Sequence, residues 1–414
     1  MLQKECILSK KVDEFIAHKG PKLSYANQPL GGEFFVKSHG LLSKQNIEKQ
    51  DITVELWEGI PCFFKTDKSA TIPFDIFAAS FYQLTRYEEY APLNKNTSAH
   101  FSYSHSLAFA QNFLHLPIVD LWICKLFEKL RDRFPDLTAA DKATYWQQLL
   151  MVDEIYRFKD KGVVRTIGGW IEDALHLNFV RIIERGLSVF GLRKDPYDNF
   201  KYLIRTFKKY EIPTQAFYSV GAYGTHDKNI SPLLKSFEIV VKHLSDYFTP
   251  GYLVSYQAAE REPLMEREKR VLSEILKRSV QHSQFHLLHQ RLPLSYRYLV
   301  EAEVFDDYSM GYLARYGYRA GTSRPFYFYD LEYEQKTPLL IHPFVLSDTY
   351  MMKLSRKMTD SELESFLKSL LQTAKLVKGN FTFVVHSKNL GERPGWKGWR
   401  RLYESILEIV KNEL

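Results

Sequence analysis

Residues 145–154 read YWQQLLMVDE, a mostly apolar run that ends in two carboxylates, Asp153 and Glu154. From this run onward, strand-like apolar segments alternate with helical ones. The strand-like segments are WQQLLMV, PTQAFYSV, GYLVSY, LPLSYRYLV, GYRAG, LLIHPFVL and FTFVVHS, and the expected helices cover 167–190, 231–247, 263–279, 359–377 and 396–414. This alternation predicts parallel β/α units, whose ligands collect at the carboxyl ends of the strands.

The first part of the chain has a different pattern. Residues 52–64 predict a hairpin, Asp75 is placed to cap a helix, and a second helix over 117–134 ends at Pro135. Residues 136–143 form a polar connector. We therefore expect a smaller α+β domain over 1–143 and a β/α barrel over 144–414, in line with the two to three domains that 414 residues favour.

The composition excludes several classes of protein. A 45% hydrophobic content, 25% charged residues and a mean hydropathy of −0.30 are typical of a globular chain and exclude collagen-like, coiled-coil and disordered classes. The three cysteines are widely spaced, so neither a disulfide framework nor a CxxC zinc site is expected. A reducing, cytoplasmic setting is the expectation. Aromatic residues are abundant at 15%.

Membrane and nucleic-acid signals are weak. The charged N-terminus lacks the apolar core of a signal peptide, and no run approaches the ~20 apolar residues of a membrane span. The net charge of +7 is spread over mixed-sign segments, so no nucleic-acid partner is indicated.

Three polar constellations follow predicted strands. Asp153 and Glu154 fit either a metal or general-base site or a solvated acidic turn. The pair His226-Asp227 lies in a glycine-containing loop that suits a binding rim or a surface turn. His386 directly follows a β run, where either a general acid/base or a satisfied polar group would sit.

Two further stretches have a functional and a structural interpretation. Residues 317–330 place Arg319 and Arg324 among aromatic residues, which fits carboxylate or sugar recognition, or a structural arginine under an aromatic cluster. His282, His286 and His289 have helical spacing and could ligate a metal, but no carboxylate or cysteine completes the set. A polar helix end is the favoured interpretation of the three histidines.

The order of these features resembles the polysaccharide deacetylase family, carbohydrate esterase family four. The resemblance rests on Asp153 after the first strand, GYLVSY, RAGTSRPF, Asp348 after a strand and the late His386. The resemblance covers about residue 70 to the end and is most specific over 306–332. It is strongest to bacterial members of the family that have an extra N-terminal domain of unknown function. It implies a distorted β/α barrel, an acetylated poly- or oligosaccharide as substrate and a zinc-type divalent metal.

The resemblance also implies roles for individual residues. Asp153 matches a metal ligand, Arg319 the arginine that orients the base, His386 the general acid and Asp348 its tuning partner. The aromatic and arginine-rich segments imply substrate binding, through Arg324, Tyr327, Tyr329 and Tyr256.

Two family positions are altered in this chain. The base position falls on Met151 and a metal histidine falls on Leu253, and neither side chain can perform the expected chemistry. A shifted register with Glu154 as base or His226 as ligand is an alternative. Three hypotheses remain. The protein is a metal-dependent deacetylase, or it is a catalytically inactive protein that binds a glycan or a partner. Ranked lowest, it binds single-stranded nucleic acid.

Overall fold

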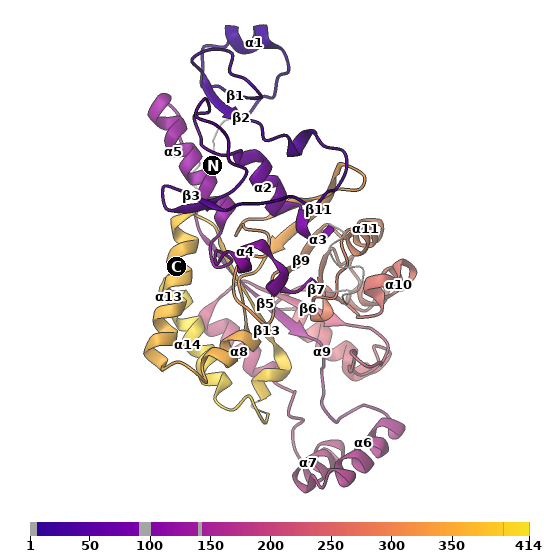
Figure 1. The fold of residues 1–414 in the computed structure, drawn as a ribbon. Helices are drawn as coiled ribbons and strands as arrows, with labels where there is room; N and C mark the ends of the chain where they lie inside the picture. Colours follow the sequence, from indigo (N-terminus) through magenta and orange to yellow (C-terminus); the bar gives the residue numbers. More distant parts are fainter. Residues whose placement is uncertain (1–5, 91–100, 140–142, 392, 414) are drawn as a thin grey trace.

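The computed structural model describes residues 6–90, 101–139, 143–391 and 393–413 (Figure 1). Its centre is a nine-stranded sheet of order β10-β11-β9-β8-β7-β6-β5-β13-β12. Neighbouring strands are parallel except β10 and β11. The strands are β5 (Tyr145–Val152), β6 (Thr214–Ser219), β7 (Thr249–Val254), β8 (His282–Phe285), β9 (Asp306–Met310), β10 (Phe326–Asp330), β11 (Gln335–Pro343), β12 (Leu346–Ser347) and β13 (Asn380–His386).

The sheet curls so that its two edges approach each other. The chain leaves β11 at Pro343 and enters β12, at the opposite edge, at Leu346. The three residue steps from Pro343 to Leu346 span at most about 10 Å. In this crossing, Phe344 N donates to Met310 O (3.1 Å) and Val345 N donates to Thr382 O (3.0 Å). Adjacent residues thus bond to opposite sides of the sheet, which gives an open barrel.

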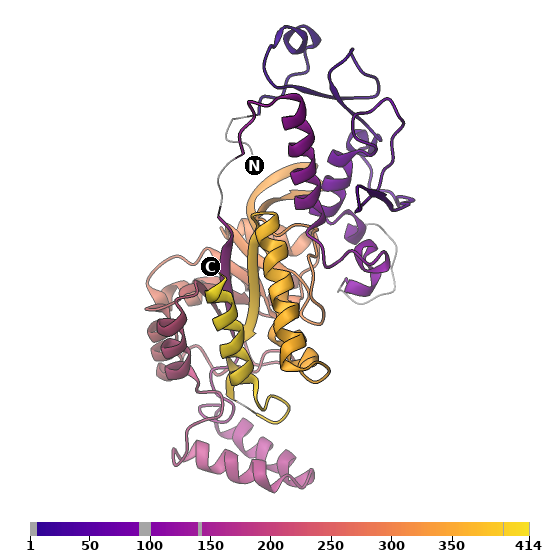
Figure 2. The same cartoon turned by 90° about the vertical axis from the view of Figure 1, so that its left-hand side faces the viewer.

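Helices cover the outer face of this barrel (Figures 1 and 2). They are α8 (Phe200–Tyr210), α9 (Lys235–Ser245), α10 (Glu262–Leu276), α11 (Leu294–Glu301), α12 (Asp348–Leu354), α13 (Asp360–Leu376) and α14 (Trp399–Asn412). Because side chains alternate along a strand, Leu150 and Val152 pack outward into the main core, and Leu149 and Met151 pack into a smaller cluster inside the barrel. Leu253 belongs to the same inner cluster.

The N-terminal region, residues 6–90 and 101–139, has a core around Trp122 and Phe74, to which Tyr312 and Leu331 of the barrel also contribute. Its regular elements are α1 (Val12–Ala17), β1 (Leu23–Ala26), β2 (Phe34–Lys37), β3 (Glu55–Trp57), β4 (Ile60–Cys62), α2 (Ile76–Leu84), α3 (Tyr87–Tyr90), α4 (Leu107–Ala110) and α5 (Ile118–Arg133). Asp75 caps α2 by accepting a hydrogen bond from Ala78 N at 2.9 Å. The boundary between 143 and 144 stays a prediction, and residues 140–142 of the connector lie outside the described residues.

The N-terminal region packs at the amino ends of the barrel strands. Asp120 of α5 accepts hydrogen bonds from Thr322 Oγ1 (2.7 Å) and Ser323 Oγ (2.6 Å). Arg324 Nη2 donates to Val377 O and Lys378 O, both at 2.7 Å, directly before β13 begins. The carboxyl ends of β5, β6 and β7 face away from most of the N-terminal region (Figure 1), whereas Tyr103 and Phe109 of that region contact Tyr312 and Arg315, which follow the end of β9.

Several sequence expectations differ from the structure. Residues 167–190 form two helices, α6 (Val163–Leu175) and α7 (Phe179–Val189), because Asn178 caps the second. LPLSYRYLV, expected as a strand, contributes most of the helix α11, and GYRAG contains no strand. Within the described residues, no helix is long and apolar enough to cross a bilayer.

Candidate functional site

A ring of polar groups lies at the carboxyl ends of the inner strands. Met151, Phe217 and Val384 form an apolar layer inside the barrel. Since side chains alternate with period two, the next inward positions along these strands are Asp153, Ser219 and His386. The sequence pattern thus brings an acidic, a hydroxyl and an imidazole side chain to one end of the barrel.

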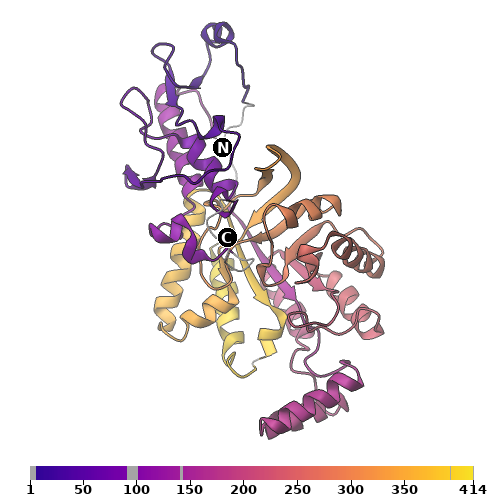
Figure 3. The ribbon, with the colours of Figure 1, turned by 45° about the vertical axis from the view of Figure 1, so that its right-hand side comes forward.

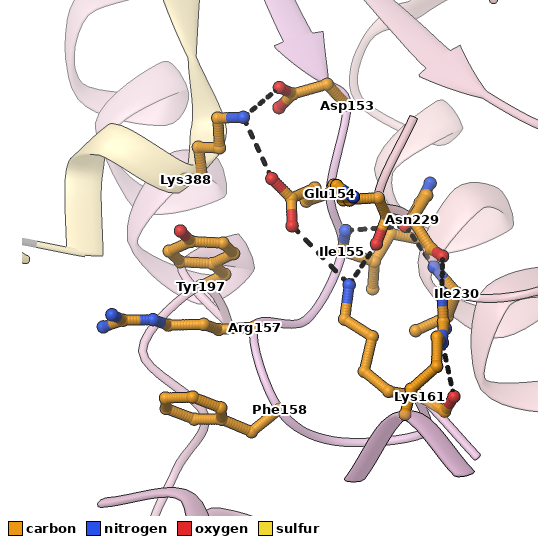
Figure 4. A network of polar contacts seen from close by, with 12 residues as sticks. Asp153, Glu154, Ile155, Arg157, Phe158, Lys161, Tyr197, Asn229, Ile230 and Lys388 are labelled. Carbon is orange, nitrogen blue, oxygen red and sulfur yellow. Dashed lines mark hydrogen bonds and ion pairs between the residues drawn. The ribbon is translucent and has the colours of Figure 1, made fainter. Parts of the chain in front are cut away.

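An ammonium group occupies the acidic part of this ring (Figure 4). Lys388 Nζ contacts Asp153 Oδ2 and lies 3.0 Å from Glu154 Oε1. On its other side, Glu154 Oε2 lies 3.6 Å from Lys161 Nζ. The Asp153 side chain is only 2% exposed, so its charge depends on protein partners for stabilisation.

The charges of this cluster reinforce one another. Burial disfavours ionised Asp153, but Lys388, His286 and His386 together outweigh burial and hold the pKa of that carboxyl well below its usual range. Burial also opposes the charge of Lys388, yet Asp153 and Glu154 raise the pKa of its ammonium. Asp153 and Lys388 are both charged at neutral pH, and a carboxylate with so low a pKa is a weak base.

His286 adds a second cation beside Asp153. Its Nδ1 lies 2.9 Å from Asp227 Oδ1, and its Nε2 lies 3.8 Å from Asp153 Oδ2. Burial lowers the pKa of His286, but the hydrogen bonds to Asp153 and Asp227 outweigh burial and raise it to about 9. At neutral pH this imidazole is therefore protonated: Nδ1 donates to Asp227, and the Nε2–H group faces Asp153 at ion-pair distance.

His386 and Asp348 form a histidine–carboxylate pair at the same end. His386 Nδ1 lies 2.9 Å from Asp348 Oδ1, while Asp348 Oδ2 accepts hydrogen bonds from His386 N and Asn389 Nδ2, both at 2.8 Å. Burial opposes the negative charge of Asp348, but His386 lowers the pKa of this carboxyl, so Asp348 stays ionised. Nδ1 must then carry the proton, which leaves Nε2 as the nitrogen for exchange with a ligand.

A stack of three rings forms one wall of the site. Tyr256 lies between His226 and His289, with ring centroids 3.9 Å and 3.6 Å away. Because both faces of Tyr256 are covered, this ring cannot stack on a sugar as expected, whereas His226 at the end of the stack is exposed. Asp227 holds the stack by accepting from Tyr256 N at 3.1 Å.

The residues present do not fit the metal implied by the resemblance. Within the described residues, no group of three or more His, Cys, Asp and Glu side chains is arranged to hold a metal ion. Asp153 Oδ1 is buried and lacks a hydrogen-bond partner in the described part of the chain, but one oxygen does not make a zinc site. The other oxygen faces Lys388 and His286, and Met151 and Leu253 belong to the inner apolar cluster.

The structure does not bring Arg319 or Arg324 to this ring. Arg319 is buried against Glu89 of the N-terminal region, with Nη2–Oε2 at 2.6 Å and Nε–Oε1 at 2.9 Å. Arg86 donates to the same Glu89 at 2.7 Å. The expected role of Arg319 in orienting a base thus has no geometric support, because its guanidinium pairs with Glu89 of the N-terminal region. Arg324 bonds the carbonyls before β13 instead.

The aromatic segment also lies elsewhere. Tyr329 packs edge-on against Phe81 of the N-terminal region (5.3 Å), and Tyr327, which is half exposed, lies under Lys336 Nζ (3.9 Å). The expected aromatic cleft at the strand ends is therefore replaced by an interface with the N-terminal region.

Sequence reasoning missed Lys388 and misjudged His286. Lys388 follows His386 by two residues, so strand alternation could have placed both at the strand end. His286 was read on a helix from its spacing, yet residues 282–285 form β8 and His286 follows its end. Phe285 is the one apolar residue in HSQFH, so this segment has no polar–apolar alternation that would have predicted the strand.

Comparisons with known proteins give a family match for one part of the chain. A family of unknown function, DUF7033, matches residues 1–135. No curated protein matches.

Solved structures that are similar to this chain include proteins described as polysaccharide deacetylases. One from Mycobacterium smegmatis has 9% identity and a TM-score of 0.41, covering 66% of this chain and 86% of its own. One from Pseudomonas aeruginosa PAO1 has 12% identity and a TM-score of 0.40, with the same coverage of 66% and 86%. One from Bacillus cereus has 10% identity and a TM-score of 0.29, covering 63% and 89%. All three similarities are distant.

Proposed function

We propose that this chain is a deacetylase-type protein that binds an acetylated saccharide at the carboxyl ends of its strands and does not carry out metal-dependent deacetylation. One observation carries this proposal: the Lys388 ammonium contacts both Asp153 and Glu154, where the resemblance places a divalent cation. A fixed side-chain cation neutralises the carboxylates that a metal would need. It offers no open coordination position for a carbonyl or a water.

The saccharide class is supported by the sequence resemblance and by the chemistry of the ring. Lys388 supplies a charged donor, and Glu154 supplies an acceptor that is partly exposed. The exposed His226 ring offers a flat face beside them. Hydroxyl and acetamido groups of sugars need such a mixture of donors, acceptors and a flat surface.

A second candidate function is metal-free hydrolysis of an acetyl group. The observation in its favour is the His386–Asp348 pair, which fixes Nδ1 and leaves Nε2 to exchange a proton with a leaving group. Lys388 would stabilise negative charge on the acetyl oxygen. The low pKa of Asp153 counts against it, because a poor base does not activate water.

The test combines binding, metal analysis and acetate release on the whole chain with oligomers of N-acetylglucosamine. By calorimetry we expect saturable binding of the oligomer, which His226→Ala weakens about tenfold. After dialysis against zinc, the protein should hold less than one zinc ion per chain. Its rate of acetate release should equal that of His386→Ala. His243→Ala, an exposed histidine on α9, is the matched control for the first variant.

Each alternative predicts a different result. Stoichiometric zinc with acetate release would overturn the proposal. Zinc-independent acetate release that disappears in His386→Ala would establish the second candidate. Absence of saccharide binding by the folded protein would remove the saccharide class.

A further inference from the structure

The hairpin of α6 and α7 projects from the barrel on the side of the strand-end ring (Figures 1 and 3). It begins directly after Lys161, which pairs with Glu154 of the ring. Its position makes it the part of the chain that extends furthest from the N-terminal region.

The hairpin has an inverted distribution of polarity. Its two helices meet through Asp173, which is 1% exposed and pairs with Arg185 (Nη2–Oδ2 2.7 Å) and Arg181 (Nη1–Oδ1 3.3 Å). The guanidinium of Arg185 packs directly over Gly169 of α6. A charged network, which normally faces water, thus fills the space between the helices.

The opposite faces of both helices are apolar and exposed. On α6 the positions are spaced by three and four residues, which places them on one stripe. The exposed residues of the two stripes include Val164, Ile167 and Ile171 on α6 and Phe179, Val180 and Ile183 on α7. Leu175 and Leu177, at 78% and 73% exposed, continue the apolar surface over the turn. An apolar surface of this extent on a globular chain marks an interaction site.

The charges around the hairpin indicate what covers it. Residues 157–194 contain eight Lys and Arg but only four Asp and Glu. Lys159, Arg193 and Lys194 are exposed where the hairpin joins the barrel. An amphipathic segment with basic residues beside its apolar face fits an anionic lipid surface. Packing two copies face to face would bring these like charges together.

We propose that the α6–α7 hairpin is a membrane-surface anchor, which lays its apolar face into the interface of an anionic lipid bilayer. The basic residues at its base contact the headgroups, and the helices do not span the bilayer. Since the hairpin follows the strand-end ring, anchoring holds the ring close to the lipid surface. The proposal is independent of the chemistry of the ring.

Flotation with vesicles tests this proposal on the full chain. We expect binding to vesicles of phosphatidylcholine with phosphatidylglycerol, and about tenfold weaker binding to phosphatidylcholine alone. Val180→Glu/Ile183→Glu should lower binding to the anionic vesicles by at least about tenfold. Arg193→Glu/Lys194→Glu should lower it and weaken its salt dependence. Leu233→Glu, at a position 91% exposed outside the hairpin, is the matched control and should bind like wild type.

Three results would overturn the proposal. The first is wild-type protein that does not float with anionic vesicles, and the second is Val180→Glu/Ile183→Glu protein that floats as well as wild type. The third is wild-type protein that forms a dimer in solution without binding vesicles, where the same double variant is monomeric; this result would assign the face to a second copy. Circular dichroism of each variant confirms that the exposed substitutions leave the fold intact.

Discussion

At the scale of single residues, the contact between Lys388 and Asp153 governs the stability of the strand-end ring. Replacing Lys388 by Met leaves the buried Asp153 carboxylate with His286 as its remaining ion-pair partner among the described residues. We expect the free energy of unfolding to fall by about 3 kcal/mol, as for other broken buried ion pairs. Urea denaturation measures this change, and Asp153→Asn/Lys388→Met should recover most of it.

Lys375→Met provides the matched control, because Lys375 pairs with Glu413 at the surface and is 40% exposed. Exposed pairs contribute no more than about 1 kcal/mol. Equal losses in the two lysine variants would contradict a buried, charge-dependent ring.

His286 gives the same ring a pH dependence. Its pKa rises from 6.5 to about 9 in the folded protein, so protonation of His286 stabilises the fold fully below pH 6.5 and this contribution is lost as the pH rises through about 9. Protonation of His286 contributes at most about 3 kcal/mol to the free energy of unfolding. Between pH 6.5 and 9.5, we expect the thermal midpoint of wild type to fall more steeply than that of His286→Gln. His243→Gln should follow wild type, and parallel curves for all three proteins would contradict the assignment.

At the scale of elements, a helix or strand could be predicted from the sequence wherever local signals determine it. The apolar run of β5, the Asp75 cap of α2 and the hairpin of β3 and β4 appear as predicted, because propensity, capping and turns act over a few residues. The pair His386–Asp348 was expected from the family resemblance, and the two side chains lie in contact.

The remaining elements depend on contacts that are distant in the sequence. Residues 317–330 looked like a binding segment because arginines and aromatic rings crowd there, yet their partners Glu89, Asp120 and Phe81 belong to another part of the chain. No local pattern reports that an arginine will meet a carboxylate more than two hundred residues away. Likewise, the apolar stripes of α6 and α7 predict amphipathic helices, but not that their polar sides would face each other.

At the scale of the whole molecule, Glu89 joins the N-terminal region to the barrel. It neutralises the buried Arg319 and shares Arg86 with Glu88. Glu89→Gln leaves Arg319 buried without an anion, and we expect a loss of about 3–5 kcal/mol in the free energy of unfolding. Limited proteolysis should then cut between the two parts earlier than in wild type. Glu413→Gln, which alters an exposed pair, is the control, and equal protease resistance in both variants would contradict this role.

The same interface has a consequence for synthesis on the ribosome. Glu89 and Arg319 are 230 residues apart, and Asp120 and Ser323 are 203 apart. At roughly 5–20 residues per second, the carboxylates emerge about 10–45 s before their donors. During that interval the nascent N-terminal region must keep Glu89 and Asp120 solvated, so its final packing waits for the last third of the chain. A chain that terminates before residue 319 lacks every one of these donors and presents an unfinished surface to cellular proteases.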